Sequence, residues 1–184
     1  MPTVKNIVLV HGAWADGSSW SKVIPLLQAK GLNVVAVQNP LTSIAEDVAA
    51  TNRMINAQKG PVLLVGHSYG GAVITEAGNH PQVAGLVYVA AFAPDEGETC
   101  GGLAQRFPTT PLFSEINPIE DGFLLLTEKG VSESPEAVKA AFRDPEGFEQ
   151  WVQHVFEDVR LRQRLSAAGL ENETSLAVTD VLCE

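Results

Sequence analysis

The chain has 184 residues, of which 45% are hydrophobic and 18% are charged, so it is long and apolar enough to form one compact domain with its own core. Its formal net charge of −10 would repel the phosphates of a nucleic acid, which argues against nucleic-acid binding. The longest wholly apolar run, 83–94, has 12 residues, whereas a membrane-spanning helix needs ~20. We therefore expect neither a nucleic-acid partner nor a membrane partner.

The sequence holds no pattern that predicts a metal or a cofactor. Its two cysteines, Cys100 and Cys183, are too few for a disulfide framework or a four-ligand zinc site. It contains no H-E-x-x-H, no Asp-rich calcium loop, no Walker loop and no G-x-G-x-x-G. The first residues lack the long apolar stretch and small-residue cleavage site of a secretory signal, so we expect a cytoplasmic protein.

Four short, Val-rich runs are typical of strands that are buried on both faces of a sheet. They are 7–10, 34–37, 62–65 and 86–91. Helix-like stretches lie between them, and this alternation predicts an α/β fold with a doubly wound, mostly parallel sheet.

The helices between these strands are predicted from apolar spacing and from capping residues. The first carries apolar residues at helical spacing, with Gly31 as its stop, and Pro25 indicates that it starts late or bends. The second begins with Ser43 and Glu46 in capping-box spacing, and the third begins just after Ser68 and fades near Asn79. The apolar positions are Trp20, Val23, Ile24 and Leu27 in the first helix and Ile44, Val48 and Ile55 along one side of the second.

The composition of the sequence changes after residue 94, and residues 94–118 are rich in Gly, Pro and Thr. We interpret 94–169 as a cap-like excursion within a single domain, 1–184. An apolar stripe that follows an N-cap at Asp144 predicts a helix ending near Gly169. The stretch 175–183 is a candidate final strand.

The strongest chemical signal is the G-x-S-x-G pattern of residues 66–70, directly after one predicted strand and directly before a predicted helix. A sharp strand-to-helix turn of this kind exposes the serine, and its flanking glycines avoid collisions. Ser68 is therefore the candidate nucleophile. The amide of Tyr69, at the start of the helix, is well placed to stabilise a developing oxyanion. The alternative is an ordinary Gly-rich turn.

A second signal is the His11–Trp14 segment after the first strand. Its turn is expected to present the Ala13 amide to the same cleft as a second oxyanion donor, because both segments follow the carboxyl ends of parallel strands. For His11 itself we favour a structural role that braces the loop over a role as a base.

These segments resemble the α/β-hydrolase superfamily through VLVHGAW at 8–14, VGHSYGG at 65–71 and VAAFAPD at 89–95. The last segment is similar to the branch that contains plant methylesterases, hydroxynitrile lyases and many small bacterial esterases, and the resemblance covers about 4–130. It implies that Ser68 is the nucleophile and that Ala13 and Tyr69 supply the oxyanion amides.

The acid and base of a Ser–acid–His triad are harder to place, because they should follow the serine in that order. Of the later histidines, His80 is expected more than a dozen ångströms from Ser68 at ~1.5 Å per helical residue. His154 is predicted on a solvated helix face and is a weak candidate base. Asp180 and Asp95 are candidate acids.

The residues thus favour a serine hydrolase that acts on small carboxylic esters. Two alternatives stay open, namely a truncated or triad-deficient protein that serves as a binding module and a hydroxynitrile-lyase-like enzyme. Because the second half departs from the family pattern, we expect the sheet to lack its last strands. The open edge would then favour a homo-oligomer.

Overall fold

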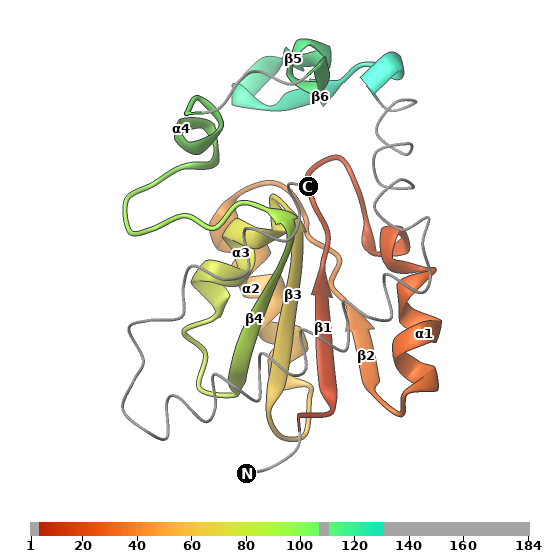
Figure 1. The fold of residues 1–184 in the computed structure, drawn as a ribbon. Coiled ribbons are helices and arrows are strands. Elements are labelled where there is room, and N and C mark those ends of the chain that lie inside the picture. Colours follow the sequence, from red (N-terminus) through yellow and green to blue (C-terminus); the bar gives the residue numbers. More distant parts are fainter. Residues whose placement is uncertain (1–3, 107–110, 131–184) are drawn as a thin grey trace. The chain divides into compact units, whose positions relative to one another are not determined.

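The computed structural model describes residues 4–106 and 111–130 (Figure 1). The chain divides into two compact units between residues 109 and 110, and each unit is described by itself. The predicted helix at Asp144–Gly169 and the candidate strand at 175–183 lie outside the described residues, as do His154 and Asp180.

The first unit is built on a parallel four-stranded sheet in the order β2-β1-β3-β4. The strands are β1 (Asn6–Val10), β2 (Asn33–Ala36), β3 (Val62–Ser68) and β4 (Val83–Ala91). All four predicted strands are confirmed. The central strands, β1 and β3, form the core with buried aliphatic residues, as their lack of polar alternation predicts.

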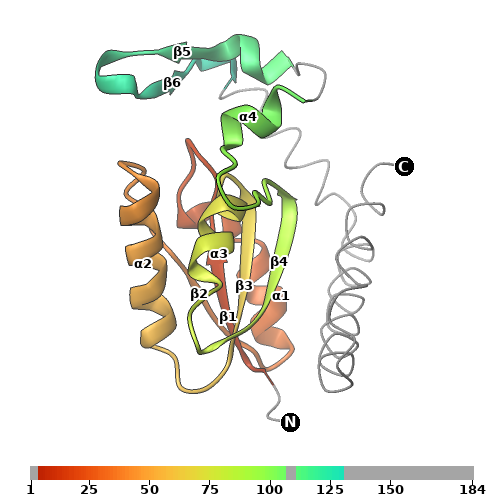
Figure 2. The ribbon, with the colours of Figure 1, turned by 90° about the vertical axis from the view of Figure 1, so that its left-hand side faces the viewer.

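Helices cover both faces of this sheet, which confirms the doubly wound α/β fold. Figure 2 shows α1 (Val23–Ala29) on one face and α2 (Ile44–Asn56) and α3 (Gly70–Ala77) on the other. The first helix starts late, as Pro25 predicts, because a separate 3₁₀ turn, η1 (Gly17–Trp20), precedes it. Gly31 follows the helix with φ of +77°.

The start of α2 confirms half of the predicted capping box and corrects the predicted buried side. The Ser43 hydroxyl accepts a hydrogen bond from the Glu46 amide at 3.2 Å, but the Glu46 carboxylate accepts from the Thr42 hydroxyl instead of reaching back. The predicted apolar side is wrong at Ile44, which is 44% exposed. The prediction is confirmed at Ile55, which is fully buried, and Val48 packs partly buried against the core. The other buried residues of the helix are Asp47, Ala50 and Thr51.

After β4 the chain forms the short helix α4 (Cys100–Ala104), still within the first unit. The second unit contains η2 (Pro111–Glu115) and an antiparallel hairpin of β5 (Ile116–Pro118) and β6 (Leu124–Leu126), joined across η3 (Glu120–Gly122). The sequence did not predict this hairpin, because its strands are only three residues long.

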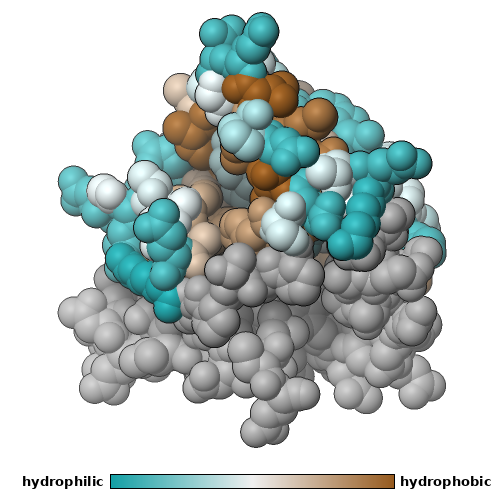
Figure 3. All heavy atoms as spheres, turned by 90° about the horizontal axis from the view of Figure 1, so that it is seen from above, coloured by the Kyte–Doolittle hydropathy of each residue, from teal (hydrophilic) through white to brown (hydrophobic). Residues whose placement is uncertain are grey.

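The second unit leaves many large apolar side chains exposed. Figure 3 shows brown apolar residues at the surface among hydrophilic ones. The exposed apolar residues of the hairpin region are Leu112, Phe113, Ile119, Phe123, Leu124 and Leu125. No helix within 4–106 or 111–130 is long and apolar enough to cross a bilayer.

Candidate active site

The candidate site lies where the order of the strands reverses. From β1 the chain moves outward to β2, and from β2 it crosses back over β1 to β3. The loops that leave the carboxyl ends of β1 and β3 therefore diverge, and open α/β sheets bind ligands in the crevice at such a point. The His11–Trp14 segment follows β1, and Ser68 is the last residue of β3.

Ser68 occupies a strained turn between β3 and α3. Its φ is +54°, a left-handed conformation that costs a residue other than glycine about 1–3 kcal/mol and is common in active sites. The carbonyl of Ser68 accepts a hydrogen bond from the Phe92 amide at 3.1 Å. The backbone thus holds Ser68 at the carboxyl end of β3, in the strand-to-helix turn that the G-x-S-x-G pattern predicts.

Two glycines let the chain close tightly around this turn. A Cβ built on Gly70 would lie 2.5 Å from the carbonyl oxygen of Val10, and one built on Gly12 would lie 2.9 Å from the Cβ of Ser68. Real Cβ atoms essentially never come so close. The segment after β1 and the turn after β3 are therefore in direct contact, which brings the two sequence signals together.

The two amides predicted to bind an oxyanion flank this contact. Ala13 is the next residue after Gly12, and Tyr69 is the next residue after Ser68. Within the described part of the chain neither amide donates a hydrogen bond. Buried or half-buried amides without a partner are uncommon in folded proteins, and two free donors beside a serine hydroxyl can stabilise negative charge on an oxygen bonded to it.

His11 braces the loop, as the sequence predicts. The side chain is fully buried, and its Nε2 accepts a hydrogen bond from the Asn39 amide at 3.0 Å. The ring proton is therefore on Nδ1, which donates to the carbonyl oxygen of Gly12 at 2.9 Å. Both ring nitrogens are used in structural contacts, so His11 has no free nitrogen with which to act as a base.

His67, the residue before Ser68, packs against the 3₁₀ turn. Its ring meets the Trp20 ring edge to face, with centroids 6.4 Å apart, and a Cβ on Gly12 would lie 3.4 Å from its Nδ1. Burial lowers the pKa of His67 below its ordinary value, because desolvation disfavours the charged imidazolium. The neutral form of the ring is therefore favoured at this packed position.

Sequence reasoning missed a buried carboxylate beside the turn that contains Ser68. The Asp47 side chain is fully buried, and its Oδ2 accepts a hydrogen bond from the Tyr69 hydroxyl at 2.7 Å. Its Oδ1 accepts from the Leu41 amide at 2.8 Å. The available signal was the small residues Ala50 and Thr51 one turn further on, which indicate the buried side of the helix.

The other predicted partners do not meet Ser68. His80 lies beside Val83, which pairs with Val62 at the far end of β3, roughly 20 Å from Ser68 at about 3.3 Å per strand residue. The prediction that His80 is remote is confirmed, and its ring contacts Asn56 and Gln82. Asp95 is exposed, with its amide bound to Glu98. The Ser68 hydroxyl makes no hydrogen bond with any described residue.

No group of three or more His, Cys, Asp or Glu side chains in 4–106 and 111–130 is arranged to hold a metal ion. In those ranges the chemical features that converge are a serine in a strand-to-helix turn and two free backbone amides. On a parallel α/β sheet, this arrangement is typical of hydrolases with a serine nucleophile.

Comparison with known proteins identifies the family. The sequence pattern of the Alpha/beta hydrolase family matches residues 7–183, and the chain belongs to this family. It is 33% identical over 117 residues to a pyrethroid hydrolase from Sphingobium wenxiniae, covering 53% of this chain and 39% of that protein. It is 29% identical over 121 residues to Methylesterase 8 of Arabidopsis thaliana, covering 58% and 44%.

A solved structure agrees with this assignment. The crystal structure of a pyrethroid hydrolase from Sphingobium faniae matches with a TM-score of 0.63 at 28% identity, covering 73% of this chain and 60% of that one. The predicted resemblance to bacterial hydrolases and plant methylesterases is thus confirmed, as is the fold class. The chain spans 39% and 44% of the lengths of the two curated relatives named above.

Proposed function

We propose that the protein hydrolyses small carboxylic esters, with Ser68 as the nucleophile and the amides of Ala13 and Tyr69 as the oxyanion donors. The names of its relatives, a pyrethroid hydrolase and a methylesterase, support an ester as the substrate. The observation that carries the proposal is the left-handed backbone of Ser68, packed against Gly12 and followed directly by Tyr69.

In the proposed reaction, the Ser68 oxygen forms a bond to the ester carbonyl carbon while its proton passes to a base. The carbonyl oxygen becomes an oxyanion, which the two amides stabilise. When the intermediate collapses, the bond to the alcohol oxygen breaks and the alcohol leaves with the proton from the base. Water then attacks the acyl-serine in the same way, which releases the acid and restores the hydroxyl.

The base of this reaction is not among the described residues. His154 is the candidate base that the sequence offers, and Asp180 or Asp95 is the candidate acid. All three assignments stay predictions. So do the absence of a cofactor, the cytoplasmic location and the self-association through an open sheet edge.

A fluorophosphonate probe tests the proposal, because it phosphonylates an activated serine and releases fluoride. We expect the native protein to be labelled at Ser68, as located by mass spectrometry of its peptides, and the Ser68→Ala variant to lose both labelling and ester hydrolysis. Ser21→Ala, which removes an exposed serine of the same unit, is the matched control and should retain both. An unlabelled Ser68 in the folded native protein would contradict the proposal.

The second candidate is a triad-deficient protein that binds small molecules without turning them over. It is favoured by the Ser68 hydroxyl, which has no hydrogen-bond partner in the described part of the chain. An oxyanion hole alone retains on the order of a thousandfold acceleration over water, so weak hydrolysis does not decide between the two. The turnover rates of Ser68→Ala and His154→Ala decide between them, since a large loss of turnover in both variants excludes the binding module.

A further inference from the structure

We propose that Asp47 is a positioning residue of the Ser68 site. Its buried carboxylate holds the side chain of Tyr69, and this contact fixes the Tyr69 amide at the position where the oxyanion is expected. The inference rests on the proposed function and deepens it, because it names the group that keeps one of the two oxyanion donors in place.

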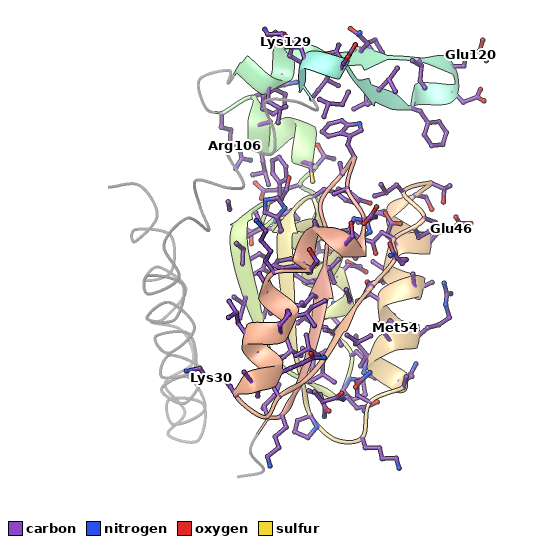
Figure 4. The ribbon with its side chains drawn as sticks, turned by 90° about the vertical axis from the view of Figure 1, so that its right-hand side faces the viewer. Lys30, Glu46, Met54, Arg106, Glu120 and Lys129 are labelled. Carbon is purple, nitrogen blue, oxygen red and sulfur yellow. The ribbon has the colours of Figure 1, made fainter. Side chains whose placement is uncertain are left out.

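Burying the Asp47 carboxylate carries a large cost in free energy. Asp47 lies on α2 and is fully buried, whereas its neighbour Glu46, labelled in Figure 4, is exposed on the same helix. A buried carboxylate is strongly destabilising unless hydrogen bonds satisfy it. Because Asp47 is buried here, its hydrogen bonds must offset the cost of removing the carboxylate from water.

The Asp47 carboxylate joins two segments of the chain. Its Oδ2 accepts from the Tyr69 hydroxyl at 2.7 Å, and its Oδ1 accepts from the Leu41 amide at 2.8 Å. Leu41 is itself held in a left-handed conformation, with φ of +57°. One carboxylate thus connects the loop before α2 to the first residue after the nucleophile, and both contacts are charge-assisted hydrogen bonds of short length.

The side chain of Tyr69 restrains the backbone amide of the same residue. Tyr69 is the N-cap of α3 with no capping hydrogen bond from its own side chain, and the Tyr69 amide has no acceptor among the described residues. The peptide that carries this amide is held at its carbonyl, because the Ser68 carbonyl oxygen accepts a hydrogen bond from the Phe92 amide at 3.1 Å. The half-buried Tyr69 ring, whose hydroxyl is bound to Asp47, restrains the same peptide from the Tyr69 side.

The protonation state of Tyr69 suits this role. Burial and the neighbouring carboxylate both raise the pKa of the Tyr69 hydroxyl above its ordinary value. The hydroxyl therefore keeps its proton and remains a donor to Asp47 throughout the pH range in which ester hydrolysis would be measured.

The test compares kcat and KM for 4-nitrophenyl acetate in the full chain, with active serines counted by phosphonate titration. We expect Tyr69→Phe to lower kcat by about tenfold or more, less than the 10²–10³ lost when an oxyanion donor is removed outright, with KM changed by less than about threefold. A group that acts in the transition state alters kcat and leaves KM nearly constant.

Further variants separate positioning from folding. Tyr88→Phe removes another half-buried tyrosine hydroxyl of the same unit, one that is 2.9 Å from the Thr75 hydroxyl, and should keep the wild-type kcat. Asp47→Ala removes both contacts and should lower kcat at least as much as Tyr69→Phe does, whereas Asp47→Asn should recover most of that loss, because its amide nitrogen can donate to the Tyr69 oxygen while its oxygen accepts from Leu41. Glu46→Gln, on the exposed side of the same helix, should be fully active.

Each outcome bears on the proposal. An unchanged kcat in Tyr69→Phe, or an equal loss in Tyr88→Phe, would overturn it while leaving the nucleophile intact. If the native protein neither hydrolyses the ester nor reacts with the phosphonate, the proposed function fails and the role of Asp47 fails with it. A kcat that falls in Tyr69→Phe and in Asp47→Ala, but not in Tyr88→Phe, and that recovers in Asp47→Asn supports the proposal.

Discussion

Two regions of the molecule are built in opposite ways. Around Ser68 the chain packs backbone against backbone, with Gly70 against the Val10 carbonyl and Gly12 against Ser68. In the hairpin of β5 and β6, large side chains such as Leu125 are about half exposed. In the first region, glycines let backbone segments pack so closely that no side chain fits between them. In the second region, large apolar side chains stay exposed. A single added methyl group should therefore matter greatly in the first region, and a removed side chain should matter little in the second.

The largest combined effect on stability and activity is expected for Gly70→Ala. Its new Cβ would meet the carbonyl oxygens of Val10 and His11 at 2.5 and 2.7 Å, and backbone atoms cannot move aside as a flexible side chain can. We expect a loss of about 3 kcal/mol in the free energy of unfolding, at the upper end for overpacking, together with loss of hydrolysis. Urea denaturation gives the stability.

Gly101→Ala is the control for this change. Nothing lies within 4 Å of the Cβ position of Gly101, so this variant should stay within about 1 kcal/mol of wild type or gain slightly from its helical position. Equal stabilities of the two alanine variants would show that the close packing at Gly70 does not constrain the chain.

Leu64→Ala and Leu125→Ala sharpen the comparison by deleting the same side chain in both regions. Leu64 in β3 is fully buried and Leu125 in β6 is 54% exposed. We expect Leu64→Ala to lower the free energy of unfolding by about 2–5 kcal/mol and Leu125→Ala by less than about 1 kcal/mol. A large loss in Leu125→Ala would mean that the hairpin is buried by contacts outside the described residues.

Gly12→Ala probes the site with a smaller displacement. The added methyl group would lie 2.9 Å from the Ser68 Cβ, so the segment after β1 must move by several tenths of an ångström. We expect kcat to fall by about 10- to 100-fold, since a shift of 1 Å can cost about 10² in rate. The free energy of unfolding should fall by only about 1 kcal/mol. A fully active variant would argue against a role for the Ala13 amide.

The smallest effect is a pH dependence of stability from His67. Burial lowers the pKa of this residue in the folded chain, so the unfolded chain binds the proton more readily once the pH falls below about 6.5. Stability should therefore be complete above this value and decline as the pH falls toward the folded pKa. His67→Gln should show a shallower decline between pH 7.5 and 5.5, and an identical decline would assign it to other groups.

The sequence predicted the first region well because its signals are local. Val-rich runs identified all four strands, and the pattern around Ser68 placed a nucleophile turn between a strand and a helix, where the backbone has the expected left-handed conformation. The role of His11 was also predictable, because a histidine in the turn after a buried strand can satisfy neighbouring backbone groups.

The features that sequence reasoning missed depend on contacts between distant segments. Ile44 was expected on the buried side of α2, but Asp47 lies there because Tyr69, 22 residues further on, provides its partner. The hairpin of β5 and β6 went unpredicted because strands of three residues carry too little alternation to be recognised. Local patterns thus predicted the turn at Ser68 between a strand and a helix, whereas the contact between Asp47 and Tyr69 could be found only from the fold.

The central claim is that the Ser68 hydroxyl and the amides of Ala13 and Tyr69 act on one substrate carbonyl. The crystal structure of the phosphonate adduct tests it most directly, because the phosphoryl oxygen mimics the oxyanion. We predict a covalent bond from Ser68 to phosphorus, with the phosphoryl oxygen about 2.7–3.1 Å from both amide nitrogens. An adduct on another residue, or a phosphoryl oxygen turned away from both amides, would contradict the claim.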